Sequence, residues 1–426
     1  MNFLVIGSSE MGESIISQLK KHGHHAFLFP NYDKCLLGEV GAQSKKLSDV
    51  VLSDSEFLLY TQMQARRGRF YNYHPDLRDE VSLSITTISI FFQKSLPDIV
   101  VFQNIPHEGF DYLIYNFCQK KNIKTVLLYQ SIFKNRFFIS SNFEDLWQNK
   151  LKLAPELRVA DVSGAKLPYM KYVDSPFASV IKLYKAIVRI FQFKWLENFR
   201  SRAFHRLARV AEVPLKMNYH RNHKKYFNCE FSSFDYKETP YIYFPLHLQP
   251  ELTTAAIGGK YDDQLLALER LVRMIPKEFK ILVKENPKQS SRYRSNLFYK
   301  RLLSIPNVCL VKRGTSSSQL IKYAYCVCTV TGTAGWEALL AGKQVVYFGR
   351  PWYCGFTGAY GIEEISESFF EKSFDVCYEK LDYEFKEFSR TMAIGVVDPY
   401  YKFTLEKFEH DKNAFNVVSA IIKYLA

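Results

Sequence analysis

The chain has 426 residues, 47% of them hydrophobic and 23% charged, which excludes a disordered protein and allows two globular domains, each with its own core. It contains 57 Lys and Arg against 43 Asp and Glu, and the net charge of +14 indicates an anionic partner such as a nucleotide, an acidic sugar, an acidic lipid or nucleic acid. Its eight cysteines include no CxxC pair and no clustered His ligands accompany them, so we expect reduced, buried thiols and no metal site.

The chain opens with a predicted strand, turn and helix over residues 3–21. The strand begins almost at once, without a basic n-region or a cleavage site, and no apolar run reaches the roughly eighteen residues of a membrane span. We therefore expect no signal peptide and a cytoplasmic protein. The turn at Gly7–Gly12 lacks the GxGxxG spacing, and no acidic residue stands at the end of the following strand, which predicts a Rossmann-like unit without bound NAD.

Two further strands, about 97–102 and 123–129, flank a predicted helix over about 112–121. This alternation predicts a parallel sheet with helices on both faces and ligands at the carboxyl ends of its strands. His107 and Glu108 follow the first of these strands. Glu108 is a candidate general base or acceptor-hydroxyl ligand, with His107 paired to it. The alternative is a helix-capping region with a solvated carboxylate.

Residues of about 175–216 predict one or two long basic helices. Aromatic and aliphatic residues recur every three or four positions, and nine Lys and Arg are accompanied by only two acidic residues, Glu197 and Glu212. This pattern is typical of a helix at a membrane surface, and equally of a core-facing helix with a wet outer face. The one-sided charge favours contact with the inner face of the membrane. No nucleic-acid recognition motif accompanies it, so we expect no nucleic-acid partner.

A polar stretch, about 218–238, predicts the linker to a second domain with strands at about 241–245, 280–283, 307–311, 327–330 and 345–348. The ends of these strands bring polar residues to one rim of the sheet. Four groups meet there: His247 with Gln249 and Glu251, Lys284 with Glu285 and Asn286, Lys312 with Arg313, and Thr331–Thr333. This convergence predicts a ligand site.

The strongest local signal lies in residues 326–349, which predict a strand, a glycine-rich turn, a short helix over Trp336–Ala341 and a second strand. The turn presents the amides of Thr333, Ala334 and Gly335 at a helix N-terminus, where the helix dipole favours a phosphate. Glu337 in the first helical turn can accept hydrogen bonds from a ribose diol. Phosphate and ribose together indicate a nucleotide. The alternative is that the glycines only join strand to helix and that Glu337 only complements the dipole.

The other rim residues have plausible roles in the same site. Lys284 can neutralise a phosphate, and Arg313 can clamp a phosphate or a sugar carboxylate. Glu251 can act as a base, a nucleophile or a stabiliser of oxocarbenium charge. The alternative for Lys284 and its neighbour Glu285 is a solvated strand end.

Several of these motifs resemble the capsule polysaccharide biosynthesis family, which contains the bacterial Kdo transferases. They are Gln249–Glu251 (QPE), Val283–Pro287 (VKENP), Val330–Glu337 (VTGTAGWE), Gly342–Val346 (GKQVV) and Gly349–Tyr353 (GRPWY), with a fainter similarity at His107–Asp111 (HEGFD). The resemblance implies a metal-independent GT-B glycosyltransferase. It further implies a nucleotide-activated sugar as donor, CMP-Kdo in the known members, and no separate cofactor.

The same resemblance implies individual roles. Glu251 matches the position assigned to catalysis, and the Gly332–Gly335 turn the position that faces the nucleotide. The family's second motif ends in His-Pro, whereas this chain has Asn286 before Pro287, which removes a titratable cation beside the phosphate.

We therefore predict an α/β protein with two Rossmann-like domains facing a cleft. The expected division is an acceptor domain over 1–225, a nucleotide-sugar domain over 235–395 and a helical segment, 396–426, that packs back on the first domain. The expected activity is transfer of Kdo or a related acidic sugar to a capsule or surface glycan or glycolipid. The alternatives are a nucleotide-sugar epimerase and an inactive capsule-assembly subunit. The predicted catalytic residues are Glu251, Glu108 and His107, and the predicted nucleotide-sugar ligands are Gln249, Lys284, Asn286, Arg313, Thr331, Gly332, Thr333, Ala334, Gly335 and Glu337.

Overall fold

The computed structural model describes residues 1–7, 9–29, 50–66, 74–162, 226–227, 229, 231, 234–235, 238–249, 254, 256–289, 294–371 and 375–426. Two predictions lie outside these residues: the basic helices of about 175–216, and the candidate catalytic residue Glu251.

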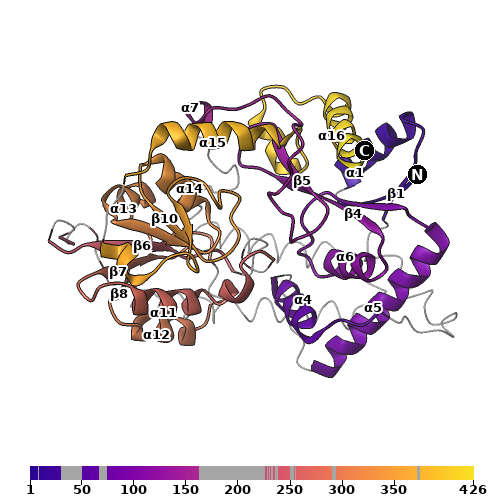
Figure 1. Ribbon diagram of the computed structural model, residues 1–426. Helices are drawn as coiled ribbons and strands as arrows, with labels where there is room; N and C mark the ends of the chain where they lie inside the picture. Colours follow the sequence, from indigo (N-terminus) through magenta and orange to yellow (C-terminus); the bar gives the residue numbers. More distant parts are fainter. Residues whose placement is uncertain are drawn as a thin grey trace, which may run out of the picture.

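The N-terminal domain is built on a six-stranded sheet of order β12-β5-β4-β3-β1-β2 (Figure 1). Its strands are β1 (Asn2–Ile6), β2 (His25–Leu28), β3 (Ile99–Phe102), β4 (Lys124–Gln130), β5 (Arg136–Ser140) and β12 (Ala393–Ile394). The first four run parallel, and β5 is antiparallel to both of its neighbours. The chain order reverses between β1 and β3, which is where sheets of this kind open a crevice.

Helices cover both faces of this sheet, as the alternating pattern predicts. They are α1 (Ser9–Lys21), α4 (Asp54–Arg66), α5 (His74–Ser95) and α6 (Phe110–Lys120). The short α7 (Val159–Val162) packs instead in the apolar core of the second domain. One apolar layer joins the sheet to α4, α5 and α6, and the other joins it to α1 and the C-terminal helix. The strands carry apolar side chains on both faces because both faces are buried.

The second domain has an all-parallel sheet of order β11-β10-β9-β6-β7-β8. Its strands are β6 (Tyr241–Pro245), β7 (Lys280–Lys284), β8 (Val308–Leu310), β9 (Cys326–Thr329), β10 (Val345–Tyr347) and β11 (Ala359–Gly361). Counted in chain order, the strands run 3-2-1-4-5-6, which is the Rossmann order. The order reverses between β6 and β9, so the ligand crevice of this sheet belongs at the carboxyl ends of those two strands.

The elements that cover the second sheet agree with the predicted pattern, apart from some boundaries. They are η2 (Gly259–Asp262), α11 (Gln264–Met274), α12 (Asn296–Ser304), α13 (Ser317–Tyr323), α14 (Thr333–Leu340), η3 (Glu367–Glu371) and α15 (Tyr378–Arg390). Helix α14 begins at Thr333, one turn before the predicted start at Trp336, because Gly332 serves as its N-cap. The predicted fold class, two α/β domains of Rossmann type, is confirmed.

The C-terminal segment returns to the first domain. β12 pairs with β5, and η4 (Pro399–Thr404) and α16 (His410–Leu425) follow. Val417, Val418 and Ile421 of α16 are buried in the same apolar layer as Phe3 and Ile15. The chain thus re-enters the first domain at Ala393, slightly before residue 395, the predicted end of the second domain.

The two domains share a continuous apolar interface. Phe133, in the loop between β4 and β5, is fully buried, with its ring 5.2 Å from that of Trp352 and 5.0 Å from that of Phe385. The first residue of α7 also contacts α15, where the Val159 amide donates to Asp382 Oδ1 at 2.8 Å. Both domains therefore contribute to one core beside the cleft.

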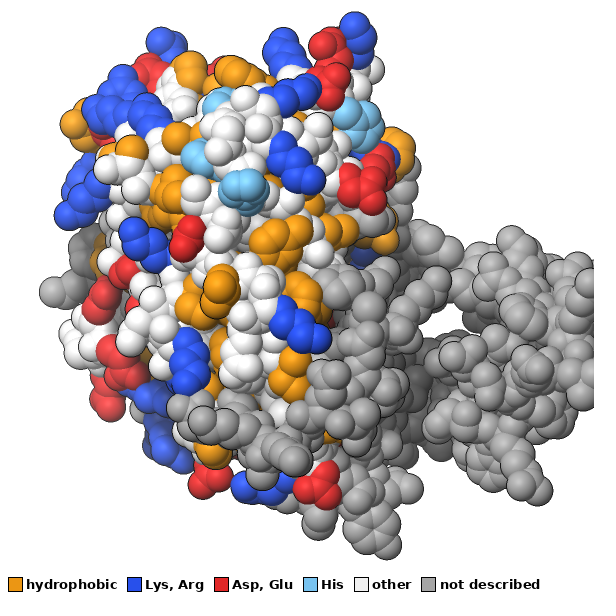
Figure 2. All heavy atoms as spheres, turned by 90° about the vertical axis from the view of Figure 1, so that its right-hand side faces the viewer, with side chains coloured by type: hydrophobic (Ala, Val, Ile, Leu, Met, Phe, Trp, Pro, Cys, Tyr) orange, Lys and Arg blue, Asp and Glu red, His pale blue; other side chains and the backbone are white. Residues whose placement is uncertain are grey.

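Figure 2 shows one face of the N-terminal domain, with Lys and Arg side chains interspersed among Asp, Glu and hydrophobic side chains. The described part of this face thus carries mixed charge. Among the residues that the structure describes, no helix is long and apolar enough to span a bilayer.

Candidate functional site

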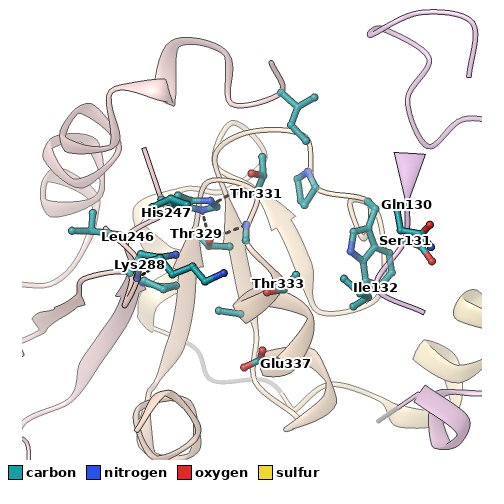
Figure 3. A pocket seen from close by; sticks show the side chains of 18 of the residues that line it. Gln130, Ser131, Ile132, Leu246, His247, Lys288, Thr329, Thr331, Thr333 and Glu337 are labelled. Atoms are coloured by element: carbon teal, nitrogen blue, oxygen red, sulfur yellow. Dashed lines mark hydrogen bonds between the residues drawn. The ribbon is translucent and has the colours of Figure 1, made fainter. Parts of the chain in front are cut away.

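A cavity of about 440 Å³ lies between the two domains. One wall comes from the carboxyl ends of β6, β7 and β9, and the other from the ends of β3 and β4 together with the segment after β12. Figure 3 shows Gln130, Ser131 and Ile132 on the opposite side of this cavity from His247 and Lys288. The cavity therefore occupies the switch point of the second sheet, as the strand order requires.

The floor of the cavity is the glycine turn between β9 and α14. The Gly332 amide donates to Thr329 Oγ1 at 3.2 Å, and the Gly335 amide donates to the Gly332 carbonyl at 3.1 Å. Helix geometry provides no intrahelical acceptor for the amides of Thr333 and Ala334, and both residues line the cavity. An anion placed there meets two donors and the positive end of the helix dipole.

His247, from the loop after β6, holds this turn in place. The Thr331 amide donates to its Nε2 at 3.3 Å, and Nε2 lies 3.0 Å from Thr329 Oγ1 (Figure 3). Because a backbone amide can only donate, Nε2 must be the unprotonated nitrogen. Burial, assisted by the charge of Arg294, lowers the pKa of His247 to about 3. The ring is therefore neutral and acts as an acceptor at physiological pH.

We predict that His247→Gln makes the protein less sensitive to acid. His247 binds a proton in the unfolded chain below pH 6.5 but not in the folded protein until about pH 3, so within this window stability rises with pH and falls on acidification. A difference of one bound proton between the unfolded and folded states changes the free energy of unfolding by about 1.4 kcal/mol per pH unit. Urea unfolding measured at pH 6.5 and at pH 5 tests this. Between these two pH values, the free energy of unfolding should fall by about 2 kcal/mol more in the wild type than in His247→Gln. Equal losses in the two proteins would contradict this assignment.

Lys284, at the end of β7, lies in the wall between β7 and α13. Its Nζ donates to Ser317 Oγ at 2.6 Å, and the Tyr243 hydroxyl lies 3.4 Å from the same oxygen. Burial lowers the pKa of Lys284, and the charge of Glu337 partly offsets this effect. Glu337 is exposed to the cavity, yet the surrounding walls raise the pKa of its carboxyl, against the charge of Lys284. Lys284 and Glu337 thus place one basic and one acidic group along the cavity, where a ligand phosphate and hydroxyls can engage them.

Glu285 lies behind Lys284 and is fully buried. It forms an ion pair with the buried Arg294 and accepts a hydrogen bond from the Tyr299 hydroxyl at 2.6 Å. Arg294 also donates to the His247 carbonyl, so this network braces the two loops that carry His247 and Lys284. The alternative interpretation of Lys284 and Glu285 as a solvated strand end is wrong, because both side chains are buried.

The N-terminal domain supplies a different wall. His107 lines the cavity, with Nδ1 2.7 Å from the Ile105 carbonyl. Asp398, which belongs to none of the motifs recognised in the sequence, lines it as well. The crevice at β1 contains no comparable space above Gly7, since a Cβ there would lie 1.9 Å from Gln103 Oε1. Residue 7 must be glycine because any larger residue would collide with the buried Gln103 side chain.

Residues 166–361 match the family model described as capsule polysaccharide biosynthesis protein. This segment, 196 of the chain's 426 residues, is similar to that family. The match ends at the last residue of β11 and includes the whole second sheet, with the glycine turn, His247 and Lys284. A search among curated proteins finds no match.

Solved structures with a similar fold include KpsC of Thermosulfurimonas dismutans, a beta Kdo 2,7 transferase. That structure has a TM-score of 0.40 and 10% identity, with 98% of this chain and 99% of that chain covered. The beta Kdo 2,4 transferase structure of the same protein has a TM-score of 0.39 and 10% identity, covering 98% and 97%. The UDP-GlcNAc 2-epimerase of Methanocaldococcus jannaschii has a TM-score of 0.25 and 13% identity, covering 100% of both chains. All three likenesses are distant.

The GRPWY motif, which lies within the matched segment, packs against the glycine turn. The Tyr353 hydroxyl donates to the Gly332 carbonyl at 2.6 Å, and Trp352 packs on Trp336 of α14 with their rings 4.8 Å apart. A Cβ on Gly335 would lie 2.1 Å from the Tyr353 hydroxyl. Gly335 is therefore needed for this packing, and it does not line the cavity.

Three other predicted site residues also lie away from the cavity wall. Gln249 directs its side-chain amide to the Asp262 carbonyl and so braces its own loop. Arg313 lies over the ring of Phe227, 4.9 Å from the ring centre. Glu108 is exposed. Their roles as ligands or catalysts therefore find no support in this geometry.

The remaining predicted ligands are brought together around the cavity: Lys284, Asn286, Thr331, Gly332, Thr333, Ala334 and Glu337. Asn286 is partly engaged, because its Oδ1 accepts from the Lys288 amide at 3.0 Å. Within the described ranges, no group of three or more His, Cys, Asp or Glu side chains could hold a metal ion. Metal independence and the absence of a cofactor stay predictions.

Proposed function

We propose that the protein is a glycosyltransferase that moves Kdo or a related acidic sugar from a nucleotide donor, CMP-linked, to a capsule or surface glycan or glycolipid. One observation carries the proposal: the family-matched domain places its glycine turn and Lys284 in a cavity that the other domain closes. A cleft between two domains can hold a donor on one wall and an acceptor on the other while excluding water.

In this proposal the donor phosphate contacts the amides of Thr333 and Ala334. Lys284 neutralises its charge, and Glu337 accepts hydrogen bonds from the ribose diol. When the sugar leaves, negative charge develops on the phosphate oxygen. Fixed amide dipoles and a buried ammonium stabilise such charge without having to reorganise.

Binding and transfer assays test the function. We expect CMP or another pyrimidine nucleotide to raise the melting temperature, and labelled sugar to move from CMP-Kdo to a bacterial glycolipid extract. An altered nucleotide sugar without any acceptor would instead identify an epimerase. Nucleotide binding without turnover would identify an inactive assembly subunit. Absence of a shift with CMP, UDP, GDP and CDP would contradict the nucleotide site.

Glu251 is our candidate for the reacting carboxylate, through its position in the QPE motif. We predict that Glu251→Gln slows sugar transfer by about a hundredfold, because the amide keeps the shape of the side chain but loses the negative charge that would stabilise oxocarbenium charge in the transition state. CMP affinity should stay within twofold of wild type in the same preparation. Undiminished transfer would remove Glu251 from the mechanism.

We also propose contact with the inner face of the cytoplasmic membrane. Residues 163–225 contain fourteen Lys and Arg but three Asp and Glu, so this stretch supplies 11 of the net +14 charges. Each basic residue near an anionic surface contributes about 1 kcal/mol. Co-sedimentation with phosphatidylglycerol vesicles at low salt, and its absence with phosphatidylcholine vesicles, is the expected result. Equal recovery with both lipids would refute the electrostatic contact.

A further inference from the structure

Asp398 occupies a defined position on the N-terminal wall of the cavity. It is the N-cap of η4, and its Oδ1 accepts from the Tyr400 amide at 2.9 Å. Gln130, at the end of β4, accepts from the amides of Val397 at 2.9 Å and Asp398 at 3.3 Å. The carboxylate is therefore fixed to the end of a sheet strand by contacts on both sides.

This wall faces the glycine turn between β9 and α14, where the donor phosphate is proposed to bind. Gln130 lies across the cavity from His247 and Thr331 in Figure 3, and Asp398 is bonded to Gln130 through its backbone. His107 and Asp398 both line the cavity. Glu108, the carboxylate that the sequence favoured for this wall, is exposed and does not line it. Among the described residues of the first domain, Asp398 is thus the carboxylate that lines the cavity.

The surroundings of Asp398 favour proton uptake. Burial raises the pKa of its carboxyl, while His107, in the loop after β3, lowers it through its charge. Tyr400 and Tyr401 flank it on its own element and line the same cavity. Behind this element Lys402 is paired with Glu10 of α1 at 2.9 Å, so its charge is already neutralised. A carboxylate of raised basicity is suited to general base catalysis near neutral pH.

We propose that Asp398 is the general base that takes the proton from the acceptor hydroxyl. This inference rests on the proposed function. As the O–H bond of the acceptor breaks, its proton passes to Asp398 and its oxygen forms the bond to the anomeric carbon. The bond from that carbon to the phosphate oxygen breaks, and the nucleotide leaves with the electron pair. Asp398 then returns the proton to water.

The matched pair of variants is Asp398→Asn and Glu10→Gln. Asn at position 398 keeps a side-chain oxygen that can accept from the Tyr400 amide, so the start of η4 should survive. Glu10→Gln weakens the contact between α1 and η4 from outside the cavity. Transfer from CMP-Kdo to a glycolipid extract should fall at least about a hundredfold in Asp398→Asn. It should stay within about twofold of wild type in Glu10→Gln, since a surface ion pair contributes little.

Two further measurements separate catalysis from a structural role. CMP affinity should be the same in wild type and Asp398→Asn, because the glycine turn that is proposed to bind CMP lies on the opposite wall of the cavity. The wild-type rate should fall as pH falls through the raised pKa of Asp398, since the base must be unprotonated. In His107→Gln this fall in rate should occur at a higher pH, because the variant lacks the His107 charge that lowers the pKa of Asp398. Asp398→Asn should lack this fall in its residual rate.

The outcomes are distinct. Wild-type protein that transfers no sugar removes the proposed function and this inference with it. Wild-type protein that transfers sugar, together with Asp398→Asn within threefold of its rate, removes the inference alone. Loss of CMP affinity in parallel with the rate would assign Asp398 to donor binding and would equally overturn its role as the base.

Discussion

Gly332→Val abolishes the nucleotide-induced rise in melting temperature and sugar transfer. A Cβ on Gly332 would lie 2.9 Å from Thr329 Oγ1 and 3.1 Å from His247 Cε1. Both neighbours are buried and bonded to each other, so the turn must move and the amides of Thr333 and Ala334 move with it. Charge-assisted hydrogen bonds contribute about 1.5–3 kcal/mol each, so losing both weakens binding by about a hundredfold or more.

Gly314→Val is the matched control. Gly314 lies in the same domain, in the turn before α13, and a Cβ there meets no atom within 4 Å. Isothermal titration with CMP should give wild-type affinity for Gly314→Val and no measurable binding for Gly332→Val. Normal affinity in both variants would show that the turn does not contact the nucleotide.

Phe133→Ala produces the largest loss of stability that we expect from one substitution. The Phe133 ring is fully buried among side chains of the other domain, in edge-to-face contact with Trp336 at 6.3 Å and Trp352 at 5.2 Å. Removing such a ring from a core costs about 3–5 kcal/mol, including the cavity left behind. Since Trp336 belongs to α14, the loss should also weaken CMP binding at the start of that helix.

Phe403→Ala serves as the control, because the Phe403 side chain is 78% exposed. Unfolding by denaturant can be followed by tryptophan fluorescence. Compared with the wild type, the denaturant concentration at the midpoint should be lower for Phe133→Ala and unchanged for Phe403→Ala. An unchanged midpoint in Phe133→Ala would mean that the domains do not share a core at this point.

The sequence predicted the glycine turn correctly because its signal is local. A strand, two glycines and a helix within residues 326–341 leave little freedom for the backbone, and strand alternation with helices fixes the fold class. The sequence pattern predicts the start of α14 one turn too late, because the N-cap residue Gly332 has no side chain that would mark the cap.

The side chains at the rim were harder to predict. Residues at a strand end reach one edge of the sheet, but their side chains can point into the crevice or away from it. Lys284 points to the cavity wall, whereas Arg313 packs on Phe227 and Gln249 turns back to Asp262. The sequence carries no periodic signal that separates these cases.

Asp398 could not have been found by spacing. Its backbone is held by Gln130, 268 residues earlier in the chain, after the C-terminal segment returns to the first domain. His247 was recognised as a rim residue but received no role. The hydrogen bonds that give it one come from β9 and the following turn, 82 and 84 residues away.

A crystal structure of the protein with CMP tests the central claim most directly. We predict phosphate oxygens within about 3 Å of the Thr333 and Ala334 amide nitrogens, with Lys284 close enough to neutralise the charge. A phosphate bound elsewhere, for example above Gly7 in the first domain, would contradict the assignment of the α14 N-terminus as the nucleotide site.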